Sequence, residues 1–97
     1  DIVAVARREA VEESGIEALA LVDPAIFDLD VHLIPERRGE PAHFHYDVRF
    51  AFRSSHRDFR VSAESHELAW VPVAALDRVT DEASMLRMAR KWLQEGR

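Results

Sequence analysis

The feature that most constrains the fold is a stretch of regular alternation between residues 43 and 53, HFHYDVRFAFR. Successive side chains of a β-strand point to opposite faces, so this spacing predicts one long strand, His43–Arg53, with an apolar and a polar face. The apolar face would consist of Phe44, Tyr46, Val48, Phe50 and Phe52. We expect this strand to lie centrally in a sheet, with its aromatic face buried against a helix.

Further strands are predicted on either side of this one. The apolar residues Phe27, Leu29, Val31 and Leu33 alternate with Asp28, Asp30 and His32, which is strand spacing. A polar loop, Pro35–Pro41, separates the two strands. After a turn at Ser54–Arg57, Phe59–Val61 is a candidate hairpin partner. Leu68–Val73 predicts a short strand that contains a proline and therefore lies at an edge or ends there.

Two helices are predicted at the ends of the chain. Residues 1–14 lack proline and glycine, and Gly15 is a suitable C-terminal stop. Small and apolar residues cover most of this helix, so we expect it to be buried on more than one side. A second helix runs from about Asp81 to Glu95, with Thr80 as N-cap and Gly96 beyond its end. Its apolar stripe consists of Leu86, Ala89, Trp92 and Leu93. The order of elements predicts one domain, residues 1–97, of the mixed α/β sandwich class.

Composition excludes several classes of function. The net charge of −5 argues against a generic nucleic-acid binder, which needs a basic surface. The chain has no cysteine, which excludes disulfides, thiolate catalysis and cysteine zinc sites. No apolar run is long enough for a membrane span, and the acidic start does not resemble a signal peptide. We therefore expect a cytoplasmic protein with no membrane or nucleic-acid partner.

The candidate site for chemistry is a group of carboxylates near the end of the first helix. At 100° per residue, Glu9, Glu12 and Glu13 lie at about 0°, 300° and 40°, which places them on one helical face. Like charges this close repel each other, and a hard divalent cation such as Mg²⁺ relieves the repulsion. A solvated acidic face is the alternative interpretation for three glutamates taken alone.

The surrounding residues favour the metal site. The segment Arg8-Glu9-Ala10-Val11-Glu12-Glu13-Ser14-Gly15-Ile16 resembles the second half of the Nudix box, Arg-Glu-U-x-Glu-Glu-x-Gly-U, in which U is a bulky apolar residue. The match departs from the motif at Ala10, which is small. The first glutamate of the box would stand immediately before Asp1. We therefore expect the chain to be the C-terminal two-thirds of a Nudix-type domain.

The resemblance implies a fold, an activity and a set of site residues. The fold would be an α/β/α sandwich with a mixed sheet, incomplete at its N-terminus. The activity would be that of a pyrophosphohydrolase, in which metal-activated water attacks phosphorus in a nucleoside diphosphate linked to another group. Glu9, Glu12 and Glu13 would bind Mg²⁺ or Mn²⁺, and Arg8 would orient a glutamate. The general base would be Glu9 or Glu64.

A weaker part of the resemblance lies downstream. Nudix domains often place a further carboxylate in a loop before a Trp-Val strand, and the segment 64–72, ESHELAWVP, is similar to that arrangement. Glu64 or Glu67 is the candidate, and Glu64 is preferred because its distance from Trp70 suits a loop that reaches the metal. A solvated loop acid is the alternative.

The polar face of the long strand is a second candidate for binding. His43, His45 and Asp47 are poorly placed for one zinc ion, because residues two apart on a strand are about 6.5–7 Å apart. We expect instead that His45, Asp47 and Arg49 border the substrate cleft. A merely polar sheet surface is the other interpretation.

Three functions remain open at the level of sequence. The first is a Nudix-type hydrolase acting on a small nucleotide-type substrate. The second is a Nudix-like domain that binds or regulates without catalysis, and the third is an acidic α+β interaction module without a metal. The sequence leaves open which nucleoside diphosphate derivative is the substrate and whether the protein forms a homodimer.

Overall fold

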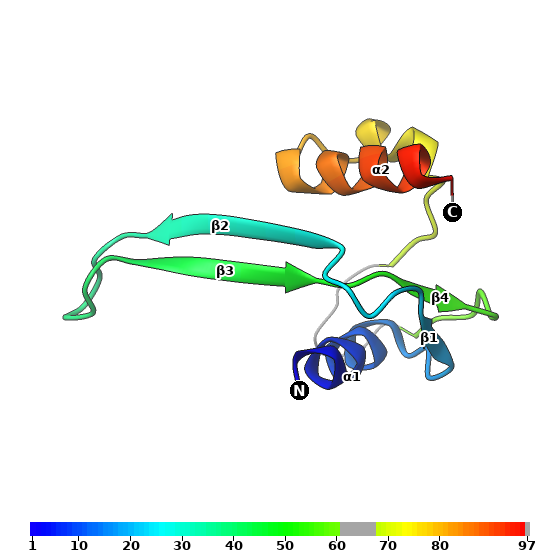
Figure 1. Ribbon diagram of the computed structural model, residues 1–97, viewed down its shortest axis with the longest axis horizontal. Helices are drawn as coiled ribbons and strands as arrows, with labels where there is room; N and C mark the ends of the chain where they lie inside the picture. Colours follow the sequence, from blue (N-terminus) through cyan, green and yellow to red (C-terminus); the bar gives the residue numbers. More distant parts are fainter. Residues whose placement is uncertain (61–67, 97) are drawn as a thin grey trace.

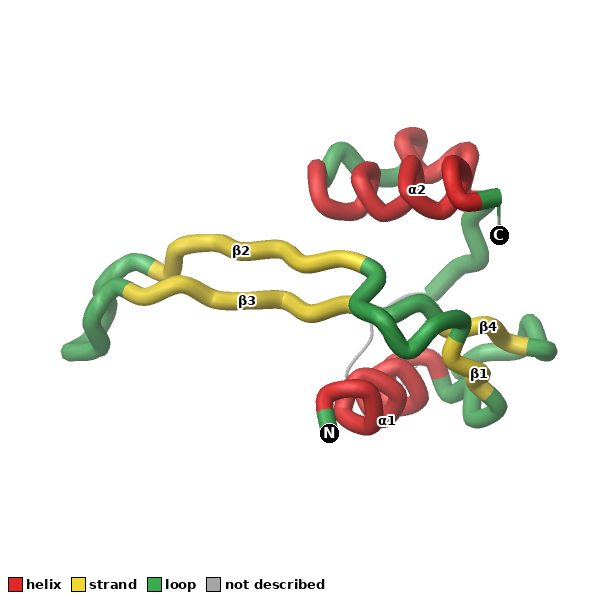
Figure 2. Tube along the Cα trace, in the orientation of Figure 1, coloured by secondary structure: helices red, strands yellow, loops and turns green. Residues whose placement is uncertain are grey.

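The computed structural model describes residues 1–60 and 68–96, which form a mixed α/β fold (Figures 1 and 2). In chain order its elements are α1 (Ile2–Ser14), β1 (Leu19–Leu21), β2 (Asp28–Ile34), β3 (His43–Arg49), β4 (Phe52–Ser54), the 3₁₀ helix η1 (Val73–Arg78) and α2 (Ala83–Glu95). The strands form two small antiparallel sheets, one of β2 and β3 and the other of β1 and β4.

The β2–β3 ribbon is the longest feature of the molecule and projects away from the helices (Figure 1). Its register runs from Asp28 opposite Arg49 to Ile34 opposite His43. At the tip, Arg38 and Gly39 have φ values of 48° and 85°, and Arg37 and Glu40 exchange two backbone hydrogen bonds of 3.0 and 2.9 Å. Positive φ at both central residues is the geometry of the tight hairpin turn that matches the strand twist. The predicted loop at Pro35–Pro41 is thereby confirmed.

The strand predicted over His43–Arg53 is interrupted. β3 ends at Arg49, and β4 begins at Phe52, where the chain changes its partner from β2 to β1. Backbone hydrogen bonds continue across the break, from Phe27 N to Arg49 O at 2.8 Å and from Val22 N to Ala51 O at 3.0 Å. The sequence pattern did not predict strand β1. It forms because residues 52–54 pair with the short apolar run Leu19–Leu21.

The ends of the helices follow from their capping residues. Asp1 accepts a hydrogen bond from Val3 N at 3.0 Å, and Gly15 ends α1 with a φ of 72° and donates its N–H to Val11 O at 2.8 Å. A left-handed glycine at this position satisfies a carbonyl of the last turn. In α2, Gly96 has the same role, with a φ of 67°. The prediction of Thr80 as N-cap is wrong, because α2 begins at Ala83 and Thr80 Oγ1 instead accepts from Glu82 N at 3.1 Å.

Within the described residues, the two short strands predicted after β4 are absent. Phe59 and Arg60 have no strand pairing, and Val61 lies outside the described residues. Residues 68–72 are irregular, and Val73 begins η1. Proline at position 72 lacks the N–H that a sheet ladder requires, and its φ of −57° suits the residue before a helix.

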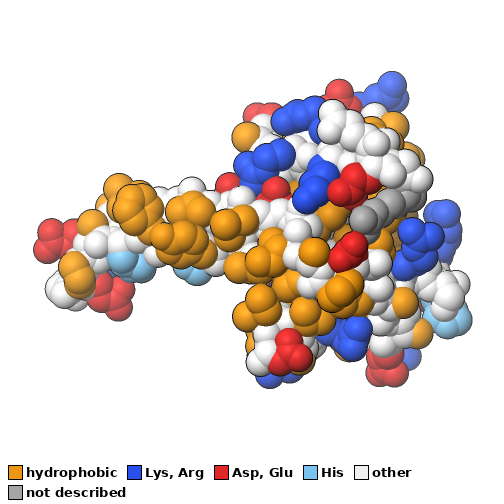
Figure 3. Space-filling model, viewed as in Figure 1, with side chains coloured by type: hydrophobic (Ala, Val, Ile, Leu, Met, Phe, Trp, Pro, Cys, Tyr) orange, Lys and Arg blue, Asp and Glu red, His pale blue; other side chains and the backbone are white. Residues whose placement is uncertain are grey.

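The prediction that the aromatic face of this strand is buried against a helix is wrong for Phe44 and Tyr46, whereas Phe50 and Phe52 are half-buried and Arg7 of α1 lies over the Phe52 ring. Phe44 and Tyr46 are 62% and 61% exposed, and the apolar residues of β2 on the same face are also exposed: Leu29, Val31 and Leu33. The space-filling view shows hydrophobic side chains along the ribbon (Figure 3). Helix α2 contacts the opposite, polar face through charged side chains, so the polar face is the better covered one at the Asp28 end.

Burial within the chain is limited. Ile16, at 7% exposure, is the only buried apolar residue among those described, and α1 contains no buried residue. The prediction that α1 is buried on more than one side is therefore wrong. The accessible surface of 7625 Å² exceeds the roughly 5,700 Å² of a compact monomer of this mass. The radius of gyration, 15.1 Å, likewise exceeds the roughly 12.5 Å of a compact domain.

Within residues 1–60 and 68–96, neither helix combines the length and the apolar character that a membrane crossing needs.

Candidate functional site

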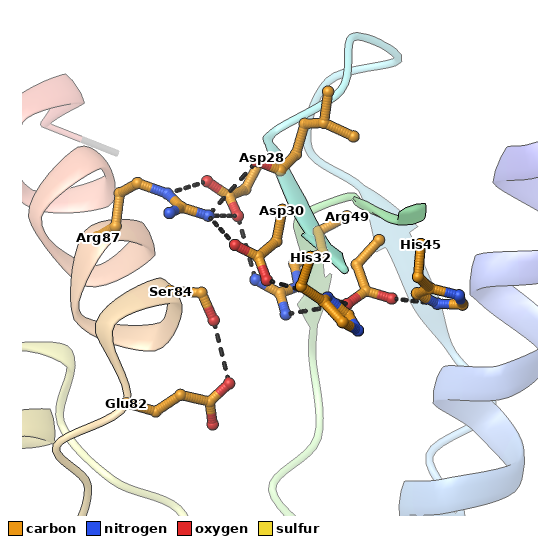
Figure 4. Close-up of polar contacts among 10 residues, drawn as sticks. Asp28, Asp30, His32, His45, Arg49, Glu82, Ser84 and Arg87 are labelled. Carbon is orange, nitrogen blue, oxygen red and sulfur yellow. Dashed lines mark hydrogen bonds and ion pairs between the residues drawn. The ribbon is translucent and has the colours of Figure 1, made fainter. Parts of the chain in front are cut away.

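Charged side chains on the polar face of the ribbon form a connected network that joins it to α2 (Figure 4). Asp28 lies at its centre, with a side chain only 7% exposed. Arg87 of α2 donates to both carboxylate oxygens of Asp28, from Nε to Oδ1 at 2.8 Å and from Nη2 to Oδ2 at 2.7 Å. Arg49 donates to the same Oδ2 at 3.2 Å. A carboxylate with this little exposure requires such partners, because burying an unpaired charge is costly.

These contacts change the proton affinity of the groups that make them. The hydrogen bond from Arg87, supported by that from Arg49, lowers the pKa of Asp28 below its usual value against the opposing effect of burial. The hydrogen bond to Asp28 raises the pKa of Arg87, which therefore remains charged. Asp28 thus anchors α2 to the ribbon through a carboxylate whose ionised form these arginines favour.

Beyond Asp28, the register places two pairs of like residues directly opposite each other: Asp30 faces Asp47, and His32 faces His45. His32 Nδ1 lies 3.7 Å from Asp30 Oδ2 and 3.8 Å from Asp47 Oδ2. The ligand atoms of Asp30, His32 and Asp47 all lie within 4.8 Å of one another, close enough to hold a metal ion. His45 Nε2 is 3.0 Å from the other oxygen of Asp47, and the two imidazole rings are 5.1 Å apart.

Two of the three glutamates of α1 border a cleft next to this network. The cleft measures about 730 Å³ and lies between one face of α1 and strand β3. Its polar lining consists of Glu9, Glu13, His45, Asp47 and Arg49, and its apolar lining of Ile2, Val5, Ala6, Tyr46 and Val48. The three predicted substrate-binding residues and two of the predicted metal ligands therefore border the same space.

The remaining predicted residues lie elsewhere. Glu12 is absent from the lining of the cleft and pairs with Arg8, whose Nε is 3.9 Å from Glu12 Oε1. This separation is that of an exposed ion pair and is too long for a hydrogen bond. Glu64 and Glu67 fall outside the described residues.

The network around Asp28 was missed by the sequence analysis. The alternation at residues 27–33 indicated that Asp28, Asp30 and His32 share a face, but it did not indicate chemistry. The pairing of the two alternating stretches could have identified these residues. When the stretches are paired as a hairpin across the Pro35–Pro41 loop, Asp30 lies near Asp47. No local pattern connects Arg87 with Asp28, which lies 59 positions earlier.

Comparison of the chain with protein-family profiles, with curated proteins and with solved structures gives no match.

Proposed function

We propose that this protein is a metal-dependent hydrolase of the Nudix type that cleaves the diphosphate linkage of a nucleoside diphosphate derivative. The observation that carries the proposal is the spacing Arg8-Glu9-x-x-Glu12-Glu13 on a single helix, followed by Gly15 as its C-cap. A second observation supports it. Glu9 and Glu13 of this segment border the same cleft as His45, Asp47 and Arg49.

The carboxylates of α1 that line the cleft suit a hard divalent cation by their ligand type. Glu9 and Glu13 present carboxylate oxygens, which Mg²⁺ and Mn²⁺ bind together with water and substrate phosphates. Bound there, the metal would neutralise charge on the phosphate oxygens and lower the pKa of water. Glu12 would join this set only after its contact with Arg8 is released. We also propose the Nudix-type α/β/α sandwich as the fold of this domain.

The residues of the chain would divide the work in the reaction. The oxygen of water forms a bond to phosphorus, the bridging P–O bond of the diphosphate breaks, and the leaving phosphate departs with the bonding electrons. A carboxylate, Glu9 or Glu64, accepts the proton of the water. Arg49 donates hydrogen bonds to phosphate oxygens, and His45 and Asp47 contact the rest of the substrate.

The test is a hydrolysis screen over nucleotide sugars, dinucleoside polyphosphates and nucleoside triphosphates with millimolar Mg²⁺ or Mn²⁺. We expect Glu9→Gln and Glu12→Gln each to lower kcat by about ten-fold or more. Each substitution removes a ligand of the metal that would neutralise charge developing in the transition state. Glu17→Gln is the matched control, since it removes an exposed carboxylate beyond the end of α1. Equal activity of all three variants would exclude the metal role. Nucleotide binding without turnover would favour the regulatory, non-catalytic domain instead.

A further inference from the structure

We propose that Asp30, His32 and Asp47 form a binding site for a first-row divalent transition ion such as Zn²⁺, distinct from the glutamates of α1. The three residues come from adjacent strands, and the register of β2 and β3 brings them to one face of the ribbon. The inference does not depend on the proposed hydrolase, because it concerns binding of the metal alone.

The distances suit a set of metal ligands. The two separations from His32 Nδ1 to the carboxylate oxygens, 3.7 and 3.8 Å, exceed those of hydrogen bonds. Ligand atoms about 2.0–2.2 Å from one zinc ion lie roughly 3.3–3.6 Å apart when arranged tetrahedrally. Side-chain rotations that shorten these two separations, and that between the two carboxylates (within 4.8 Å), would bring the three atoms into that range. The residues are half-exposed, with side-chain exposures of 29% for Asp30, 46% for His32 and 34% for Asp47, so an ion has access.

The imidazole nitrogen distinguishes this group from a patch of acidic side chains. Oxygen-only sites suit Mg²⁺ and Ca²⁺, whereas a mixed set of one nitrogen and two carboxylates suits Zn²⁺ and its neighbours in the first transition row. Three protein ligands leave at least one coordination position for water or another molecule.

In each carboxylate of the site, the oxygen that does not face His32 contacts another side chain. Asp30 Oδ1 accepts a hydrogen bond of 3.4 Å from Arg87 Nη2, while its Oδ2 faces His32. Asp47 Oδ1 lies 3.0 Å from His45 Nε2, while its Oδ2 faces His32. Outer contacts of this kind orient metal ligands and support their affinity. His45 is therefore a positioning residue for Asp47.

The local charge is compatible with a cation. Asp28, Asp30 and Asp47 carry three negative charges, and Arg49 and Arg87 carry two positive ones, which leaves one negative charge with the histidines neutral. Arg49 Nη2 lies 3.8 Å from Asp47 Oδ2 and must move slightly as this oxygen binds an ion.

The experiment is a Zn²⁺ titration of the purified protein by calorimetry, without nucleotide, repeated with Co²⁺ to obtain the visible absorption of the bound ion. We expect one bound equivalent, and we expect His32→Gln to weaken binding by about ten-fold or more. His56→Gln, which removes a histidine outside the site, should change affinity by less than about two-fold. Glu9→Gln should bind Zn²⁺ like the wild type, which separates this site from that of the proposed hydrolase.

A second measurement keeps the inference testable if His32→Gln is unstable. Long-range ¹H–¹⁵N spectra of the wild-type imidazoles should show Zn²⁺ bound at Nδ1 of His32. Unchanged His32 resonances at saturating Zn²⁺ would overturn the inference, and so would equal affinities of the His32 and His56 variants.

Discussion

Gly15 is subject to two independent restrictions at the end of α1. Its φ of 72° lies in the left-handed region, and a Cβ added there would lie 2.7 Å from the Cβ of Arg60. The close approach comes from a backbone hydrogen bond of 2.7 Å between Arg60 N and Ser14 O, which holds the chain after β4 against the helix. A glycine is therefore needed both for the turn and for the neighbouring segment.

These two restrictions can be separated by substitution. Gly39 also has a positive φ, of 85°, but has no atom within 4 Å of an added Cβ. We expect Gly39→Ala to lower the free energy of unfolding by about 1 kcal/mol, the cost of the left-handed conformation. Gly15→Ala should cost roughly 2–4 kcal/mol, because overpacking against Arg60 is added. Urea denaturation measures both values, and equal losses would show that Arg60 does not approach Gly15 in solution.

The β2–β3 ribbon is the element in which the sequence pattern and the structure differ most. The alternation is typical of a sheet whose apolar face is buried. In the structure, the face that α2 covers is the polar one, at the Asp28 end of the ribbon, where Arg87 contacts Asp28. The aromatic side chains on the apolar face, Phe44 and Tyr46, lie opposite Leu33 and Val31 and are largely exposed to solvent. Phe27, which immediately precedes β2, differs from them because its ring packs against Trp92 at a centroid distance of 6.2 Å.

The same substitution at two phenylalanines tests this difference. Phe44→Leu should change the free energy of unfolding by less than about 0.5 kcal/mol, since the ring is largely exposed. Phe27→Leu should cost about 1 kcal/mol, because it removes the aromatic contact with Trp92. Both values follow from urea denaturation of the two variants. A larger loss for Phe44→Leu than for Phe27→Leu would mean that the apolar face is covered in solution.

Local patterns were sufficient for much of the secondary structure. Helix α1, its stop at Gly15, the strands within residues 27–33 and 43–49 and the loop between them all follow from spacing and capping residues. The break after Arg49 could not be predicted, because it depends on which strand pairs with residues 52–54. Coverage of the sheet faces could not be predicted either, since it depends on where α2 packs. For the candidate site, the spacing of Glu9 and Glu13 indicated a shared face, but only the placement of α1 beside β3 brings that face to Asp47.

The molecule as a whole buries little of its apolar surface. A domain gains most of its stability from such burial. The stability of a chain with this much exposed surface therefore depends more strongly on ligands that bind its folded state. Ligands that neutralise the carboxylates of the cleft are expected to have a large effect for this reason. The repulsion between the glutamates of α1 increases this effect, because it destabilises the folded state when no cation is bound.

Thermal stability should therefore respond to divalent cations. A ligand that binds only the folded state stabilises it by RT ln(1 + [L]/Kd), or about 2.7 kcal/mol at a hundred-fold excess over Kd. We expect the Tm to rise with millimolar Mg²⁺ or Mn²⁺ and much less with NaCl of equal ionic strength, as measured by scanning calorimetry. The double variant Glu9→Gln/Glu12→Gln should lose this rise. Equal shifts from sodium and magnesium would indicate general screening and a solvated acidic helix face.

The contacts of α2 have a consequence for hydrogen exchange. The helix meets the ribbon through the Arg87–Asp28 pair, a hydrogen bond from Lys91 to the carbonyl of Phe27 and the Trp92 ring, and of its residues only Ser84 is buried. Few apolar contacts would be lost if it detached, so its opening free energy is expected to lie well below that of global unfolding. The amides of α2 should then exchange through a sub-global opening in which Asp28 becomes hydrated and Arg87 separates from it, while Arg49 stays opposite Asp28 on the ribbon.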